Sequence, residues 1–376
     1  MRFSSLSMSS LFALALLSPV RARGDDPGQP TAAEEATPGW VPRVDAFIDA
    51  GGELGMDGWD GETLGDDSGF FLRTLGVFLD SRLSPAVSFF AGICYGDGFG
   101  VGEAYISLHE LLPGLDLRLG KIRQSFGAIQ RWHLPRMDQF DLPLPLGEYL
   151  GPDGLAQVGV SLDWSLPAGW SADPRIELQL TNGSDPRLFS GEHFSVPVGL
   201  LRISQAILPS SSLRLELGLS GMYGANNRRA LEDESGQRVD EPWRTTTVAG
   251  VDLSLLFFVD ERDYFTWRAE GIWVGKQTGP GYLAAAGGYS YVDFSHADRW
   301  VFGLRGDLAQ PFAEDAEGEL LWQAVAYASW MPWAWLRMRL QASHADGTRA
   351  PAEDRLILEL TLCTKMPEIA RARRSR

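Results

Sequence analysis

Apolar and polar residues alternate with a period of two along much of the chain. In residues 156–164 apolar side chains occupy every even position, and the positions between them carry Gln157, Gly159, Ser161 and Asp163. The same alternation recurs in residues 175–181, 213–220, 247–257, 336–343 and 355–362. Because successive side chains on a strand point to opposite faces, each segment predicts a two-faced β-strand. About 14–16 strands of membrane-spanning length fit between Val44 and Cys363.

Two architectures produce such strands. A soluble β-sandwich buries the apolar face in its core, whereas an outer-membrane barrel turns it to lipid and keeps the polar face on a wet lumen. The strands are long, their polar faces carry full charges, and aromatic residues lie near strand ends on the apolar face, where membrane interfaces favour them. These aromatic residues are Trp164, Phe257, Trp267, Trp273, Trp300, Phe302, Trp322 and Trp330. The pattern predicts an all-β, transmembrane, antiparallel up-and-down barrel of about 14–16 strands.

The ends of the chain have a different character. Residues 1–23 begin with Arg2, continue into an apolar core and end in small residues, the pattern of a signal peptide. A buried N-terminal helix is the alternative. Residues 24–42 are rich in Pro, Gly, Ala and Glu and predict a flexible linker. We therefore expect a signal peptide at 1–23, a linker at 24–42, an outer-membrane barrel at 43–363 and a basic tail at 364–376.

Composition narrows the function classes. The 376 residues include 49 acidic and 33 basic side chains, a net charge of −16 that argues against nucleic-acid binding. A mean hydropathy of −0.11 is typical of soluble proteins, but a charged lumen and acidic loops averaged with a lipid-facing band produce the same value. Cys94 and Cys363 fall on strands that are not neighbours in an up-and-down barrel, so no disulfide between them is expected.

Two blocks of sequence resemble a known group. Residues 117–123 read LRLGKIR, and they are followed by Phe126-Gly127, a stretch with His133, and GPDGL at 151–155. This order resembles the phosphate-selective porin-like family of Gram-negative outer-membrane β-barrels, as do Gly281-Tyr282 and the turn at 330–332. The resemblance implies a passive channel in the outer membrane. The sequence departs from this family pattern at the end of the chain. A basic tail stands there in place of the aromatic terminal residue that such barrels present to the assembly machinery.

Charged residues on the polar faces are the candidate lumen lining. Arginine and acidic side chains recur two residues apart on several strands, and rings of such charges select solutes by charge and size. Cross-strand fastening of the wall is the equally favoured alternative. The predicted lumen-lining residues are Arg175, Glu177, Arg214, Glu216, Asp252, Arg268, Glu270, Arg305, Asp307, Arg337, Arg339, Arg355 and Glu359.

The connection at 126–151 is long for a barrel. Long loops without regular structure are usually functional or disordered. We predict that this loop folds into the lumen as a constriction, and a cap at the mouth is the alternative. The predicted constriction residues are Arg131, His133, Arg136, Asp138 and Asp141.

No catalytic, cofactor or metal site is predicted. The five histidines show no HExxH spacing, and no nucleophile, base and orienting acid stand out along the sequence. We predict a non-enzymatic, porin-like channel for passive diffusion of small hydrophilic or charged solutes. The alternatives are a metal or siderophore uptake receptor, suggested by acidic stretches such as 51–68, and a secreted soluble β-sandwich that binds carbohydrate. Expected partners are outer-membrane lipids, lipopolysaccharide and the barrel-assembly machinery, and a homotrimer is the candidate assembly.

Overall fold

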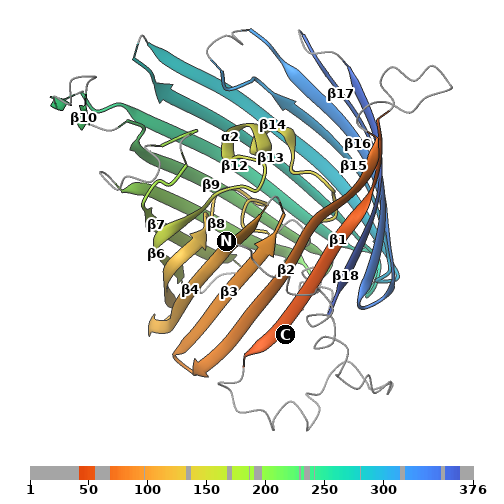
Figure 1. Cartoon of the computed structure of the whole chain (residues 1–376). Coiled ribbons are helices and arrows are strands. Elements are labelled where there is room, and N and C mark those ends of the chain that lie inside the picture. The colour runs from red at the N-terminus through yellow and green to blue at the C-terminus, as the bar shows by residue number, and fades with distance from the viewer. Residues whose placement is uncertain are drawn as a thin grey trace, which may run out of the picture. The chain divides into compact units, whose positions relative to one another are not determined.

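The computed structural model of the chain describes residues 42–55, 68–96, 98–132, 137–166, 172–185, 187–189, 197–227, 230–232, 238–240, 242–279, 281–313, 318–348 and 352–364. Within these residues, sixteen antiparallel strands close into one barrel, and two short strands form a separate hairpin. One short helix, α2, lies inside the barrel (Figure 1). None of the described helices is long and apolar enough to cross a membrane.

The elements follow one another along the chain in this order: β1 (Arg43–Gly55), β2 (Gly69–Ser84), β3 (Val87–Tyr95), β4 (Phe99–Leu112), β5 (Leu115–Arg123), α2 (Leu144–Leu150), β6 (Ala156–Ser165), β7 (Ala172–Thr181), β8 (Val198–Ser210), β9 (Leu213–Ala225), β10 (Ala230–Glu232), β11 (Arg238–Asp240), β12 (Thr245–Phe258), β13 (Tyr264–Gln277), β14 (Tyr282–His296), β15 (Trp300–Ala309), β16 (Leu321–Trp333), β17 (Leu336–Gly347) and β18 (Glu353–Cys363).

The barrel is a meander. Each of its strands pairs with its neighbour in the chain, β9 pairs with β12 across the β10–β11 hairpin, and β1 closes the barrel against β18 from Phe47↔Cys363 to Gly55↔Arg355. The predicted up-and-down barrel is confirmed, with sixteen strands, and the β-sandwich alternative is wrong because a closed barrel has no second sheet. Cys94 on β3 and Cys363 on β18 are separated in the wall by β1 and β2.

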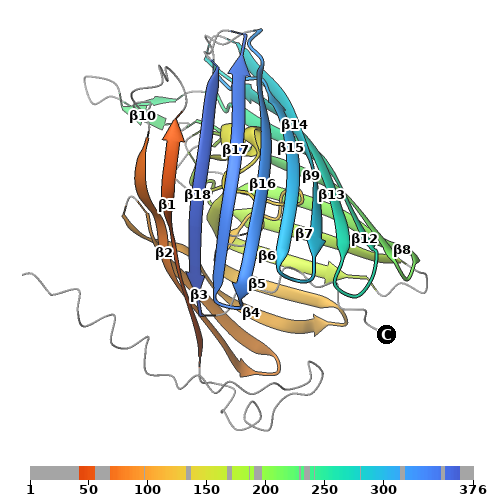
Figure 2. The same ribbon diagram turned by 90° about the vertical axis from the view of Figure 1, so that its right-hand side faces the viewer.

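The two ends of the barrel differ. At one end the connections are short, such as residues 211–212 and 334–335, and β1 begins and β18 ends there (Figure 2). At the other end are the long connections, including 124–155 and 182–197. We call these the short-turn end and the long-loop end. Short turns on one side and longer loops on the other are the arrangement of outer-membrane barrels.

The outer surface of the wall is apolar. Leu219 and Leu304 are each 62% exposed, and the eight aromatic residues predicted to face lipid are all 37% to 46% exposed. Trp164, Trp267, Trp300 and Trp330 lie toward the short-turn end, and Trp273 and Trp322 toward the long-loop end. Two aromatic belts therefore flank an apolar band, as interfaces between lipid and water require.

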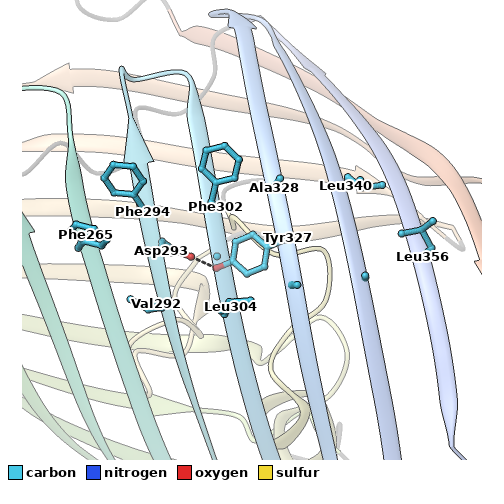
Figure 3. A pocket seen from close by; sticks show the side chains of 13 residues that line it. Phe265, Val292, Asp293, Phe294, Phe302, Leu304, Tyr327, Ala328, Leu340 and Leu356 are labelled. Atoms are coloured by element: carbon cyan, nitrogen blue, oxygen red, sulfur yellow. Dashed lines mark hydrogen bonds between the residues drawn. The ribbon is translucent and has the colours of Figure 1, made fainter.

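Gly303 in β15 leaves space for a hydrogen bond on the inner face of the wall, and the outer face of the same region is apolar. Gly303 pairs with Asp293 of β14 on one side and Tyr327 of β16 on the other, and the Tyr327 hydroxyl reaches across it to donate a hydrogen bond to Asp293 (Figure 3). A Cβ at position 303 would collide with the tyrosine ring. On the outer face, the same region is a shallow apolar depression bordered by Phe265, Phe302 and Leu340.

Candidate functional site

Residues 124–132 and 137–155 of the connection between β5 and β6 lie inside the barrel, and we call this connection, residues 124–155, the lumen loop (Figure 1). Its apolar side chains form one buried cluster with the inner wall. Loop residues Phe126, Ile129, Met137, Leu146 and Tyr149 pack in this cluster with wall residues of β8, β9, β12, β13 and β14. Burial of this much apolar surface fixes the loop against the wall instead of leaving it mobile in water.

Local sequence explains the helix in the lumen loop. Pro143 precedes α2 and Pro145 lies in its first turn, where a missing N–H costs nothing. Gly151 ends the helix with φ of 89°, a conformation that favours glycine. The Tyr149 hydroxyl donates to the carbonyl of Gln310 (3.0 Å), and burial raises the pKa of this phenol, which therefore stays a neutral donor. The Glu148 carboxylate accepts a hydrogen bond from the Phe312 N–H (3.0 Å).

Four wall arginines hold the middle of the lumen loop by its backbone. They come from β2, β15 and β17, and each donates to a carbonyl oxygen of residues 137–141. The bonds run from Arg73 to Phe140, from Arg305 to Asp141 (2.9 Å), from Arg337 to Met137 (2.8 Å) and from Arg339 to Met137. We call these four side chains the arginine clamp. A guanidinium suits this role because its several donors serve loop and wall together.

Arginines of the clamp pair with acids of the wall. Arg339 pairs with Glu359, and Arg73 lies 2.9 Å from Glu359 and 3.6 Å from Asp49. Of these four side chains, Arg339, Glu359 and Asp49 are at most 1% exposed. Charges this deeply buried interact strongly because little water screens them.

Further contacts secure the same stretch of the loop. Arg305 pairs with Asp307 at 3.0 Å. Asp307 also accepts from the Leu144 N–H at 3.0 Å, and Gln341 accepts from the Phe140 N–H at 2.8 Å. Side chains of β15 and β17 therefore hold both backbone donors and backbone acceptors of the loop.

The start of the lumen loop is held by side chains of β9 and β13. The Gly127 N–H donates to Ser220 (3.1 Å), and the Ala128 N–H donates to Glu270 (3.1 Å). Gly127 has φ of 61°, and a Cβ there would collide with the Glu270 carboxylate. The Tyr289 hydroxyl donates to the same carboxylate (2.6 Å). Only glycine fits at position 127, because both the backbone angle and the space require it.

The predicted lumen-lining residues fall into two groups. The first is buried in the wall or beneath the lumen loop and consists of Glu177, Asp252, Glu270, Arg305, Asp307, Arg337, Arg339 and Glu359. The second remains partly open to water and consists of Arg175, Arg214, Glu216, Arg268 and Arg355. In the first group, the arginines and several of the acids hydrogen-bond to the lumen loop or pair with residues of the wall.

Ion pairs form across strands more often than along them. Arg175 pairs with Asp163 of β6 (3.0 Å) although Glu177 is two residues away. Arg202, which the sequence did not single out, makes two bonds to Asp252 of β12 (2.5 and 2.9 Å). Its polar position in the alternation of β8 was the available signal. Arg305 and Asp307 do pair along one strand.

The predicted constriction residues are placed as follows. Arg131 pairs with Glu216 of β9 (3.3 Å). Asp141 accepts from Gln341 (3.1 Å) and lies 3.8 Å from Arg355. Asp138 is half-buried. His133 and Arg136 lie outside the described residues.

Two cavities with charged linings lie on either side of the lumen loop. The long-loop cavity, of about 920 Å³, is lined by Arg73, Lys121, Arg123, Asp141, Glu148, Asp153 and Arg355 among others. The short-turn cavity, of about 570 Å³, is lined by Arg131, Trp132, Arg175, Arg214, Glu216 and Arg268 among others. The charged side chains that line the short-turn cavity are four arginines and one acid, so its lining is mainly basic. Arg268 also stands over the Trp132 ring, 4.5 Å from its centroid.

Comparison with known proteins bears on the fold. No family model matches the sequence. An uncharacterized protein of Aquifex aeolicus (strain VF5) is 27% identical over 281 residues, which cover 68% of this chain and 57% of that protein. The chain thus spans little more than half the length of this curated relative.

Solved structures resemble the barrel over most of its length. The anion-selective porin from Comamonas acidovorans has a TM-score of 0.57 at 10% identity, covering 86% of this chain and 99% of that chain. The barrel has the fold of the outer-membrane porins. The outer membrane channel DcaP of Acinetobacter baumannii (TM-score 0.55, 12% identity, 86% and 96% covered) and the trimer form of OmpT of Vibrio cholerae (0.56, 9%, 86% and 98%) share this porin fold. Membership of the phosphate-selective group stays a prediction.

Proposed function

We propose that this chain is an outer-membrane porin through which small hydrophilic or charged solutes diffuse passively. The observation that carries the proposal is a closed sixteen-strand barrel with an apolar outer band and a polar interior in which the lumen loop separates two cavities with charged linings. A barrel of sixteen strands encloses an interior wide enough for an aqueous channel. The likeness to an anion-selective porin and to an outer-membrane channel supports the same function.

In this proposal the lumen loop sets the width of the passage. A solute entering at the long-loop end meets the cavity lined by Lys121, Arg123 and Asp153, passes the loop, and leaves through the short-turn cavity. The arginines of the short-turn cavity raise the local concentration of anions, because low-dielectric walls focus the field of one charge sign. We infer that the channel prefers anions to cations of equal size.

The proposal also includes assembly and surroundings. Residues 1–23 direct export, the barrel-assembly machinery inserts the barrel, and the aromatic belts contact outer-membrane lipids and lipopolysaccharide. The likeness to the trimer form of OmpT supports a homotrimer.

Conductance in planar lipid bilayers tests the channel function. The full-length protein should produce discrete current steps, with reversal potentials in a salt gradient that indicate anion preference. A folded barrel, verified by heat-modifiable gel mobility, that yields no current steps would contradict the proposal.

Replacing arginines of the short-turn cavity by glutamates should weaken the preference of the channel for anions. Arg175→Glu with Arg214→Glu changes two lining residues of the cavity, so the anion-to-cation permeability ratio should fall roughly severalfold at low salt, where charges are least screened. The matched control is Arg262→Glu with Arg299→Glu, which makes the same change of charge in exposed short turns at the same end. Equal shifts in both double variants would show that the cavity charges do not govern selectivity.

A further inference from the structure

Three side chains on neighbouring strands form a connected line on the inner wall. Ser88 of β3 and His109 of β4 are joined through Oγ and Nε2 at 2.8 Å, and His109 Nδ1 lies 3.2 Å from Asp116 Oδ2 of β5. The serine contacts one ring nitrogen and the carboxylate contacts the other. This is the order in which serine hydrolases connect nucleophile, base and orienting acid.

The backbone around the histidine keeps this line in place. The pairing of β4 with β5 shifts register between Leu108 and Leu112, and Glu110 in this bulge has φ of 53°. The Glu110 N–H donates to Asp116 Oδ1 (2.9 Å), which leaves Oδ2 for the imidazole. The His109 N–H donates to the Ala86 carbonyl (2.8 Å) in the turn before β3. Bulges are used in sheets to re-aim a side chain, and this one turns His109 toward Ser88.

Water and solutes can reach the three groups. Ser88 pairs with Ser107, a buried residue of the lumen face, so both serines project inward. The His109 and Asp116 side chains are 30% and 43% exposed, and the group lies near the short-turn end. The sequence could not reveal it, because the strand register, not the spacing along the chain, brings the three residues together.

The neighbouring side chains of the same face supply what an ester would need. Arg82 of β2 is the register partner of Ser88, and directly paired residues project from the same face about 5 Å apart. One guanidinium nitrogen of Arg82 donates to the Pro85 carbonyl (3.0 Å), which leaves its other donors for a ligand bound at Ser88. Two residues further along the strands, Phe90 and Tyr105 stack with ring centroids 5.3 Å apart and offer an apolar surface to an acyl or aryl group.

We propose that Ser88, His109 and Asp116 hydrolyse small carboxylic esters at the short-turn end of the lumen. Ser88 Oγ bonds to the ester carbonyl carbon while His109 Nε2 takes the hydroxyl proton, and Asp116 stabilises the imidazolium. Arg82 stabilises the oxyanion. The C–O bond to the alcohol breaks and His109 returns the proton to the leaving alkoxide. Water then repeats the sequence on the acyl-serine, releasing the carboxylic acid and restoring Ser88.

The test uses the full-length barrel in detergent micelles with 4-nitrophenyl acetate and butyrate. We expect hydrolysis that Ser88→Ala lowers by about a hundredfold or more, while Ser107→Ala, the adjacent serine on the same face, leaves it unchanged. A fluorophosphonate should add its mass to the peptide that carries Ser88. Equal rates for the wild-type protein and Ser88→Ala, or no label on Ser88, would overturn the proposal. Heat-modifiable mobility confirms that each variant is folded, and none of these measurements depends on conductance.

A positioning role for Asp116 gives a second readout. Asp116→Asn should lower the rate, because the imidazolium formed during the reaction loses its anionic partner, whereas Asp116→Glu, which keeps a carboxylate, should retain part of it. Equal rates for Asp116→Asn and Asp116→Glu would exclude Asp116 from the proposed site.

Discussion

Removing the lumen loop should raise the single-channel conductance by roughly twofold or more, since a sixteen-strand barrel without an inserted loop encloses an open aqueous channel. Arg123 at the end of β5 and Ala156 at the start of β6 are register partners. A four-residue Gly/Ser turn can therefore replace residues 124–155 without disturbing the pairing of β5 with β6. The arginine clamp loses its carbonyl partners, but its charges then face water, which hydrates them.

The measurement is conductance in planar bilayers in concentrated salt, where fixed charges are screened and the width of the passage dominates. The control is deletion of residues 228–241 from the connection between β9 and β12, which changes a loop at the long-loop end and leaves the lumen loop intact. Unchanged conductance after removal of residues 124–155, in a barrel with normal heat-modifiable mobility, would mean that this loop does not limit the passage.

The two groups of charges have separate physical roles. Arg305, Arg337 and Arg339 are buried and donate to loop carbonyls, so a passing ion meets the loop backbone instead of these guanidinium groups. Arg214 and Arg268 line the short-turn cavity, whereas Arg175 in the same cavity is paired with Asp163 at 3.0 Å. A charge acts on a solute when it is within a Debye length across water and is not cancelled by a nearer partner. We therefore expect the charges that line the cavities to determine ion selectivity. We expect the arginine clamp to determine the position of the lumen loop.

The alternation of side chains was sufficient to predict the barrel. Long two-faced strands with outward aromatic residues have one stable closure, because a sheet with an apolar outer face and a charged inner face needs lipid outside and water inside. The lumen loop was also predictable as a long insertion between two strands. Which wall residues hold it was not, because that depends on contacts between residues up to about two hundred positions apart, such as Arg337 with Met137.

A bulge between β1 and β2 interrupts the alternation of apolar and polar residues in β2. The pairing of β1 with β2 shifts between Asp49 and Ala50, and the outward positions of β2 change from Phe70 and Leu72 to Leu75 and Val77. One extra residue reverses the face of every side chain that follows. Arg73 lies at this reversal, so its membership in the arginine clamp was hidden from any count of alternating positions.

The buried charges of the clamp lead to the largest expected effect on stability. Arg339→Ala should lower the free energy of unfolding by about 3–5 kcal/mol, the range for removing one partner of a buried ion pair. The cause is what remains: Glu359 and Asp49, both fully buried, would share Arg73 as their cation, and the Met137 carbonyl would keep one arginine donor instead of two. Unfolding by urea in lipid vesicles, monitored by tryptophan fluorescence, measures the change.

The control is Arg43→Ala, which removes an arginine that pairs with Asp45 at 2.8 Å but is 67% exposed. Water screens that pair, so its loss should cost less than about 1 kcal/mol. Similar costs for both variants would show that burial does not strengthen the Arg339 contacts.

A double variant separates the two possible causes of the loss, an unpaired Glu359 carboxylate and a missing bond to the lumen loop. Glu359→Gln is added to Arg339→Ala, because a neutral amide no longer requires a cation. The double variant should recover much of the lost stability if an unpaired carboxylate is the source of the cost, and it should recover none if the loss comes from the missing bond to the lumen loop.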